Sequence, residues 1–321
     1  MKVLRIVFIL IINQLHSQVS GCTDALAKNY NPKATKNDGS CFYQNLKIKS
    51  QYSKKLSDSI KETSGLIDFS NLIWTHNDDH DKTIYGLDSL GIIKKKIILK
   101  NATNHDWEEI SQDSSHIYIG DFGNNYSGNR TNLQILKIEK NSFLAEIPKI
   151  EIISFTYSDQ NDFTPLKPNK TNFDCESFIV SKDSIYLFTK QWKSSKTNIY
   201  SLPNQAGNHI ATYKSTLDTK GLVTGATYLE NKNLIVLCGY TKLGKPFLYL
   251  LYDFKNQDFL SGNKRRISLK LPFHQIEGIA TKDGLHYYLT NEALIRKPVI
   301  NIEQQLHYLD LSSVLGSYLH K

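Results

Sequence analysis

The residues best placed for chemistry in this chain are carboxylates that recur at one position of a repeated phrase. The phrase is a short polar turn that leads into an apolar stretch. Its second residue is glutamate in three copies, at Glu108, Glu176 and Glu277, and aspartates stand two positions earlier at Asp106 and Asp174. Carboxylates brought together repel one another unless they are protonated, hydrated or paired with a cation. A group of them can therefore hold a metal ion or act as an acid and a base.

The copies of the phrase are roughly 50 residues apart, a spacing typical of strand-rich repeats. Each copy begins a set of short stretches rich in Ile, Tyr and Leu, which are separated by turn residues. One such set cannot bury its apolar faces alone, so the sets must pack side by side around a centre. The pattern predicts an all-β fold, a β-propeller of five blades, with six blades as the alternative. The copies are Thr63–Leu66, Trp107–Ile110, Cys175–Phe178, Val223–Ala226 and Ile276–Ile279.

Four of the expected blades contain four strands each, whereas the fifth contains only three. We expect Leu46–Lys49 to supply the missing outer strand, because joining the two ends of the chain in one blade protects the open sheet edges. The stretch Asp159–Asn172 could hide a sixth blade, but it is polar, carries two prolines and is better interpreted as a loop. The expected strands are 64–70, 72–76, 83–88 and 92–99; 108–113, 116–121, 133–138 and 149–156; 176–181, 184–189, 197–201 and 209–216; 224–230, 233–239, 246–253 and 265–271; and 277–281, 285–290 and 305–310.

The expected ring brings the carboxylates together, because the inner strands of a propeller begin near its central channel. Equivalent positions of different blades then meet at one mouth. An alternative role is structural, since a carboxylate that starts an inner strand can accept hydrogen bonds from the backbone of a neighbouring blade. The candidate ligand or metal residues are Asp106, Glu108, Asp121, Asp174, Glu176, Glu277 and Asn291, and Asn77, Asp78, Asn124, Lys190 and Glu292 end second strands near the same opening.

Three functions are compatible with these residues. In the first, the mouth binds a ligand through a divalent cation such as calcium, with Glu108, Glu176 and Glu277 as the metal ligands. In the second, the same glutamates serve as acid and base in a hydrolase that acts on a glycan, a phosphate ester or a lactone, and their separation would predict the stereochemical outcome for a glycan. In the third, the propeller is a scaffold for another surface protein. Trp192, beside Lys190, could stack a planar ligand or pack on a neighbouring blade.

The N-terminal residues indicate export. A basic start and the apolar run Ile6–Ile12 precede Ser17, as in a secretory signal of residues 1–17. Residues 21–43 then form a small unit with two cysteines, and the propeller is expected over 45–316. Cys22 has two possible fates, a disulfide with Cys41 or attachment of a lipid. No later stretch is apolar enough to cross a membrane, which needs roughly 20 residues.

The composition of the 321 residues is that of a globular protein, with 40% hydrophobic and 22% charged residues. The formal net charge of +8 would suit a nucleic acid or an anionic surface. The basic residues are, however, dispersed in short runs such as Lys94–Lys96 and Lys264–Arg266, each beside apolar strand residues. Such lysines oppose aggregation of sheet edges. Nucleic acid is therefore not an expected partner, and the unknown partner is a small ligand or a surface protein.

Two segments resemble known families. The segments Gly21–Asp24 and Asp38–Cys41 resemble a short two-cysteine module of secreted bacterial proteins. The segment His105–Ile110, followed by Tyr118–Asn125, resembles bacterial propellers related to esterase-like phytase and to quorum-regulated extracellular propellers. This second resemblance implies a propeller fold with an acidic, often calcium-binding, central site, but it carries over no complete catalytic motif. Asp24, Asn29 and Asp38 of the small module could also supply oxygen ligands to calcium, or could simply form turns.

Overall fold

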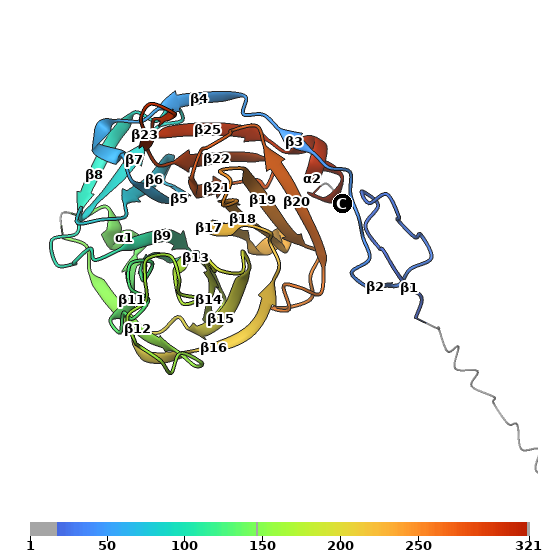
Figure 1. The fold of residues 1–321 in the computed structure, drawn as a ribbon, viewed down its shortest axis with the longest axis horizontal. Helices are drawn as coiled ribbons and strands as arrows, with labels where there is room; N and C mark the ends of the chain where they lie inside the picture. The colour runs from blue at the N-terminus through green and yellow to red at the C-terminus, as the bar shows by residue number, and fades with distance from the viewer. Residues whose placement is uncertain (1–17, 146, 320–321) are drawn as a thin grey trace, which may run out of the picture.

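In the computed structural model, residues 18–145 and 147–319 are described, and most of them form a ring of β-sheets (Figure 1). Antiparallel pairing groups the main strands into five units of four. The first three units are β5 (Thr63–Phe69), β6 (Leu72–Asn77), β7 (Thr83–Leu87) and β8 (Ile93–Ile98); β9 (Trp107–Gln112), β10 (His116–Asp121), β11 (Leu133–Glu139) and β12 (Ile150–Tyr157); and β13 (Cys175–Ser181), β14 (Ser184–Thr189), β15 (Thr197–Pro203) and β16 (Gly207–Leu217). The others are β17 (Leu222–Leu229), β18 (Leu234–Tyr240), β19 (Pro246–Tyr252) and β20 (Asn263–Leu269); and β21 (Ile276–Thr281), β22 (His286–Asn291), β25 (Gln305–Asp310) and β4 (Tyr52–Lys55).

The first strands of the five units surround the centre of the ring. β5 packs beside β9, β9 beside β13, β13 beside β17 and β17 beside β21, and β21 returns to β5. These strands are buried almost throughout, as in β13, whereas outer strands such as β20 alternate between buried and half-buried residues. Alternation arises because successive side chains of a strand point to opposite faces. This closed circle of radial sheets is a β-propeller, and the all-β prediction is confirmed.

The chain closes the ring differently from the sequence-based prediction. β3 (Lys47–Ile48), in the segment expected to complete the last unit, instead pairs in parallel with β20 at the edge of the fourth unit. The next segment, β4, pairs with β25 and completes the last unit. The assignment of Leu46–Lys49 was therefore wrong, although an N-terminal strand does close the ring. The N-terminal segment thus pairs with the outer edges of two units in succession, first β20 and then β25. The outer strands β12 and β16 pair with each other in parallel, so each protects the edge of the other.

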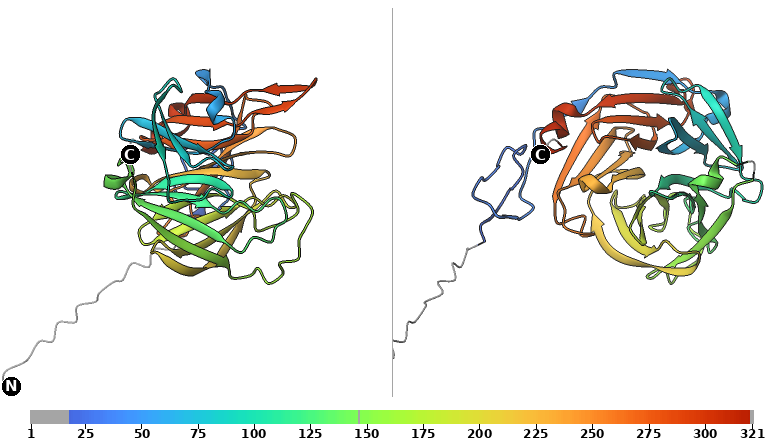
Figure 2. Two further views of the ribbon diagram at one scale, coloured as in Figure 1. Left: turned by 90° about the vertical axis from the view of Figure 1, so that its left-hand side faces the viewer. Right: turned by 180° about the vertical axis from the view of Figure 1, so that it is seen from behind.

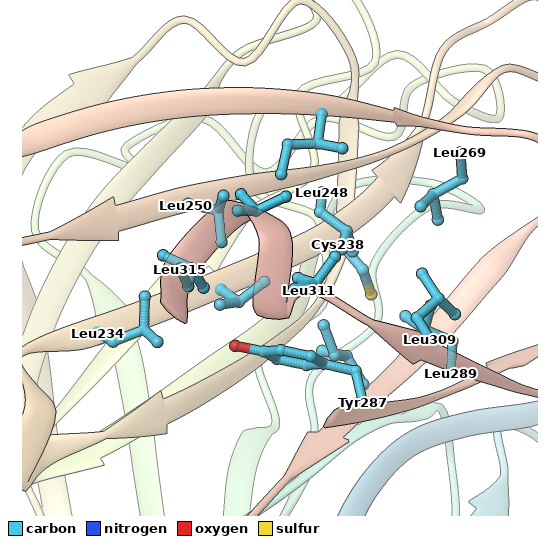
Figure 3. Close-up of a cluster of buried hydrophobic side chains, with 14 of the residues drawn as sticks. Leu234, Cys238, Leu248, Leu250, Leu269, Tyr287, Leu289, Leu309, Leu311 and Leu315 are labelled. Atoms are coloured by element: carbon cyan, nitrogen blue, oxygen red, sulfur yellow. The ribbon is translucent and has the colours of Figure 1, made fainter. Parts of the chain in front are cut away.

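Apolar side chains fill the spaces between neighbouring units. Figure 3 shows one such cluster, in which Leu250 of β19 and Tyr287 of β22 meet Leu315 of the C-terminal helix α2 (Ser312–Leu319). These side chains are fully buried. The helix thus joins the fourth and fifth units by packing over both. Shorter elements are the 3-10 helices η1 (Asp58–Ile60) and η2 (Glu230–Lys232), the helix α1 (Lys140–Phe143) and the hairpin β23 (Leu294–Arg296) with β24 (Ile300–Ile302).

The two-cysteine unit lies outside the ring, beside β3 (Figure 1), and holds the short strands β1 (Ser20–Gly21) and β2 (Lys36–Asn37). Its disulfide joins Cys22 to Cys41, as predicted. Asp24 accepts hydrogen bonds from the hydroxyl groups of Tyr43 and of Tyr252 on β19, so the unit is anchored to the fourth sheet. The expected signal segment, residues 1–17, lies outside the described residues.

The remaining expectations concern turns, loops and membrane helices. Asp38 accepts a hydrogen bond from the Ser40 N–H within a turn, and Asn29 accepts one from the N–H of the more distant Phe42, so both side chains have structural contacts. The segment Asp159–Asn172 forms no strand, as expected. Within residues 18–145 and 147–319, no helix has the length and apolar character needed to cross a membrane.

Candidate acidic site at the mouth of the ring

The repeated phrase marks a β-bulge in every inner strand. In β9, Trp107 and Glu109 pair with consecutive residues of β10, which leaves Glu108 as the extra residue. Glu176 and Glu277 are the extra residues in β13 and β21. Thr224 has the same place in β17, and β5 is irregular just after Ser64. A bulge redirects a side chain and is frequent beside functional sites. The bulges therefore explain why the second residue of the phrase turns away from the regular sheet.

The second residues of the five phrases fall into two chemical classes. Two of them carry hydroxyl groups that join neighbouring inner strands: Ser64 Oγ donates to the carbonyl oxygen of Glu108 at 2.8 Å, and Thr224 Oγ1 donates to that of Ile276. The other three carry the carboxylates of Glu108, Glu176 and Glu277. The two hydroxyl groups link neighbouring inner strands, whereas the three carboxylates are the groups available for chemistry at the mouth.

Three carboxylates form a tight group where the second and third units meet. Glu108, Asp174 and Glu176 each place one carboxylate oxygen within 4.8 Å of the others. Their side chains are almost completely buried, with exposed fractions of 5%, 0% and 3%. A Cβ atom built on Gly123 would lie 2.3 Å from Glu108 Oε1 and 2.3 Å from Asp106 Oδ2. Asp106 therefore borders the group, and Gly123 lacks a side chain where these carboxylates need the space.

Lys190 is the counter-charge of this group. Its Nζ atom lies 2.9 Å from Glu176 Oε1. Nζ also lies 4.7 Å from the ring centre of Trp192 and 5.5 Å from that of Tyr240, which are cation–π distances. Burial acts to lower the pKa of Lys190, but the surrounding negative charges, that of Glu176 foremost, outweigh burial and hold the pKa well above its ordinary value. The ammonium group is therefore charged at neutral pH.

Asp174 is oriented by two hydrogen bonds. The backbone N–H of Asn124 donates to Oδ1 at 2.9 Å, and Trp192 Nε1–H donates to Oδ2 at 2.7 Å. These contacts fix the carboxylate and the indole ring relative to each other. Because a carboxylate oxygen has more than one lone pair, Asp174 retains the capacity to bind a cation.

One ammonium group does not balance the carboxylates around it. Burial, and next the charge of Glu176, raises the pKa of Glu108 well above its ordinary value. Burial raises the pKa of Glu176 in the same way, and burial followed by the charge of Asp174 raises that of Asp106 to about 6. Each raised pKa means that the ionised form is disfavoured in this place. The carboxyl groups therefore favour their protonated form, and a bound cation would have to displace these protons.

A second set of carboxylates extends the acidic region toward the fifth unit. Glu277 is buried, and its Oε2 atom has no hydrogen-bond partner among the described residues. Burial, and next the charge of Glu277, raises the pKa of Glu292 to about 8. Asp78 also has a pKa of about 8, through burial and then the charge of Glu62. Carboxyl groups with raised pKa values therefore extend across the mouth from the second unit to the first.

The structure places the candidates from the sequence in different roles. The tight group contains Glu108 and Glu176 as expected, but its third member is Asp174, and Glu277 lies outside it. Asp121 forms an ion pair with Arg130 at 2.9 Å and also contacts His105. Asn291 bonds to His307 and to the carbonyl oxygens of Glu292 and Glu303. Both residues thus tie loops and strands together near the mouth, and metal ligation by either stays a prediction.

Sequence reasoning missed Glu109 and Tyr240. Glu109 Oε2 accepts a hydrogen bond of 2.7 Å from the backbone N–H of Ala226, on an inner strand that is not adjacent in the ring. Glu109, the neighbour of Glu108, thus links two inner strands through a backbone hydrogen bond. Tyr240 ends β18 at the position where Asp121 ends β10 and Asn291 ends β22. That equivalence was a signal that could have identified it.

Comparisons with known proteins add no functional assignment. No protein-family model and no curated protein sequence matches the chain. Among solved structures, the PQQ-bound aldose sugar dehydrogenase of Streptomyces coelicolor aligns over 81% of this chain and 98% of its own, at 8% identity and a TM-score of 0.42. A streptogramin B lyase aligns over 81% and 98%, at 11% identity and a TM-score of 0.40. Scores this low carry no argument, so the fold assignment rests on the strand pairing and the site on its own geometry.

Proposed function

We propose that the protein binds a small ligand at the mouth of the ring, through a divalent cation held by Glu108, Asp174 and Glu176. The observation that supports this proposal most strongly is the approach of three buried carboxylate oxygens to within 4.8 Å of one another. Calcium and magnesium take carboxylate oxygens as ligands, and calcium tolerates irregular geometry. Calcium is therefore the proposed ion.

The balance of charge supports a bound cation. Asp106, Glu108, Asp174 and Glu176 face the ammonium group of Lys190, and the charge of Arg130 also acts on Asp106, so carboxyl groups still outnumber the cations. Burying an uncompensated ion costs several kcal/mol. The unpartnered Oε2 atom of buried Glu277 adds a further negative atom whose charge acts on Glu176 and Lys190. A divalent cation would neutralise this excess, and its arrival would displace protons from carboxyl groups with raised pKa values.

A hydrolase is the second candidate, because two carboxylates close together could act as acid and nucleophile. Retaining glycosidases hold such a pair about 5–5.5 Å apart around the scissile bond. Exposed fractions of 5% for Glu108 and 3% for Glu176 leave little access for a bulky glycan. Burial therefore favours an ion over a sugar at this point.

The proposed location is outside the cytoplasm. A disulfide bond is typical of oxidising compartments, and the bond between Cys22 and Cys41 supports export of the chain. Because the sulfur of Cys22 is committed to that bond, we favour a disulfide-linked module over a lipid anchor.

Titration calorimetry of calcium and of magnesium into chelator-treated protein tests the proposal. Wild-type protein should bind one calcium ion per chain with release of protons, detected as a dependence of the measured heat on the ionisation enthalpy of the buffer. Glu108→Gln and Asp174→Asn should each lose at least about tenfold in affinity, or about 1.4 kcal/mol. Glu139→Gln, an exposed residue of β11, is the matched control and should bind as wild type. Absence of calcium binding, together with an unchanged melting temperature in chelator, would remove the metal from the proposal. If the wild-type protein hydrolysed a glycan and Glu176→Gln did not, the hydrolase would be supported instead.

A further inference from the structure

The acidic group adjoins a cavity whose walls have the opposite charge. The cavity has a volume of about 600 Å³, and its lining includes Trp192 and Tyr240, whose rings also contact Lys190 of the acidic site. Cavities of roughly 300–1,000 Å³ are the usual size for small organic ligands. The hairpin β23–β24 forms part of the wall and projects beyond the disc in Figure 2, left, where it is red. The cavity is therefore a chamber above the carboxylates and not a part of them.

The charged residues that line this chamber are all basic. They are Lys170, Lys242 and Arg296, and no carboxylate of the described residues lines it. Lys170 and Lys242 come from two different loops and Arg296 ends β23, and all three side chains are exposed. Lys242 Nζ donates to the carbonyl oxygen of Lys193 at 3.3 Å, and among the described residues none of the three forms an ion pair with a carboxylate. Cations that line one chamber without a carboxylate partner attract an anion from solution.

The rest of the lining is aromatic and aliphatic. Trp192 is held in one orientation by its bond to Asp174, and Lys190 lies over one part of its ring. Phe273 and Leu243 are 48% and 73% exposed, which is unusual for large apolar side chains that meet at one place. A chamber of this composition favours a flat apolar body over a sugar with many hydroxyl groups.

The backbone at Phe273 gives an independent sign that this wall is built for a ligand. Phe273 has a φ of 65°, in the left-handed region that a bulky residue rarely adopts. Its N–H donates to the carbonyl oxygen of Gly244 at 2.7 Å, and a Cβ atom on Gly244 would lie 3.0 Å from the Phe273 ring. Strained residues of this kind concentrate at ligand sites. Here the strain holds an aromatic ring at the rim of the chamber, against solvent.

We propose that this chamber binds a planar organic anion, an aromatic carboxylate, with its ring among Trp192, Tyr240 and Phe273 and its charge toward Lys170, Lys242 and Arg296. The inference rests on the proposed function in one respect only, namely that a ligand binds at the mouth of the ring. It requires no metal, because the basic side chains themselves supply the counter-charge. It also explains why a wall above a strongly acidic group carries three cations and no acid.

The test compares 2-naphthoate with 2-naphthamide, which has the same ring and no charge, and with decahydro-2-naphthoate, which has the charge and no flat ring. Binding is measured by calorimetry and by quenching of Trp192, because Trp74 and Trp107 are fully buried. Naphthoate should bind at least about tenfold more tightly than either analogue, and more weakly as salt is added. Lys242→Gln and Arg296→Gln should each weaken binding by about threefold, as expected for exposed charges. Lys95→Gln, on the outer strand β8, is the control and should change nothing.

The outcomes separate this inference from the proposed function. Equal affinity for naphthoate and naphthamide, or no binding of any of the three compounds, would overturn it even if calcium binds. Selective binding of naphthoate in chelator, without any calcium binding, would support it and reject only the metal in the proposed function. Trp192→Leu should abolish naphthoate binding, and Trp192→Phe, which keeps a ring, should restore most of it.

Discussion

Lys190 Nζ and Glu176 Oε1 lie 2.9 Å apart, with only 5% and 3% of their side chains exposed. This pair comes from adjacent strands of the third unit, Glu176 at the bulge of β13 and Lys190 directly after β14. A buried pair contributes little net stability while both partners remain, because desolvation of the two charges offsets their attraction. The pair matters here because Lys190 supplies one positive charge beside several carboxylates. A bound cation must neutralise the negative charge that remains when those carboxylates are ionised.

Removal of Lys190 tests that relationship. Lys190→Met leaves the buried Glu176 without its counter-charge, and we expect the free energy of unfolding to fall by about 3–5 kcal/mol. Calcium should recover part of the loss, because it can replace the ammonium charge. Urea denaturation with calcium and with chelator measures both effects. The double variant Lys190→Met/Glu176→Gln is the control, and an equal loss in it would show that the single variant acts through packing alone.

The acidic mouth predicts a specific pH dependence of stability. Asp78 and Glu292 have folded-state pKa values of about 8, against about 4 for carboxyl groups in an unfolded chain. The folded protein keeps these protons where the unfolded chain has lost them, so their stabilising contribution is complete below about pH 4 and is lost as the pH rises through about 8. Without metal, the melting temperature should therefore fall between about pH 5 and 9.

Two further measurements check this pH dependence. Asp78→Asn/Glu292→Gln should flatten the decline, and calcium should stabilise the wild type more at high pH than at low pH. A melting temperature that rises with pH over this range would show that these carboxyl groups are ionised in the folded state.

We expect Glu109 to contribute to the stability of the fold and not to calcium binding. Glu109→Ala removes the acceptor for the Ala226 N–H, and a buried unsatisfied donor costs about 1–3 kcal/mol. Glu109→Gln keeps one acceptor oxygen and should cost less. Chemical denaturation measures the losses, and calorimetry should give wild-type calcium affinity for Glu109→Gln. A large loss of calcium affinity in Glu109→Gln would place Glu109 among the ligands.

Gly123 tests whether the carboxylates need the space beside them. Gly123→Ala places a Cβ atom 2.3 Å from Glu108 Oε1, so Glu108 or Asp106 must move. We expect a cost of about 1–3 kcal/mol in stability and a loss of calcium affinity. Gly316→Ala in α2 is a matched control, since nothing lies within 4 Å of its Cβ position. That control should be neutral or slightly stabilising, because alanine favours a helix. Unchanged calcium affinity in Gly123→Ala would mean that calcium binding does not need the space beside Glu108 and Asp106.

The strands were predictable because their period and turn residues are local. The phrase at Trp107–Ile110 correctly marked the start of an inner strand, yet it could not show that Glu108 is the bulged residue while Glu109 crosses toward Ala226. A one-residue shift in register exchanges these roles, and register depends on pairing with β10. Asp174 was a candidate, but its place in the tight group depends on contacts from Asn124 and Trp192.

The ring closure and the chamber depend on contacts between distant segments. The exchange of β3 for β4 at the last unit was hidden because both segments are short and carry no pattern that identifies the sheet edge with which they pair. The hairpin β23–β24 was not predicted either, and its position beside the mouth is fixed by a bond from the Ala293 N–H to the carbonyl oxygen of Lys61. Sequence patterns within one segment contain no information on such partners.

The central claim is that Glu108, Asp174 and Glu176 jointly hold a divalent cation. Diffraction from crystals grown at about pH 8 and soaked in manganese, measured near the manganese absorption edge, tests it most directly. The account predicts one anomalous peak within about 2.0–2.6 Å of an oxygen from each of the three side chains, and its absence from crystals of Asp174→Asn. A map with no peak there, or with the only peak among other residues, would contradict it.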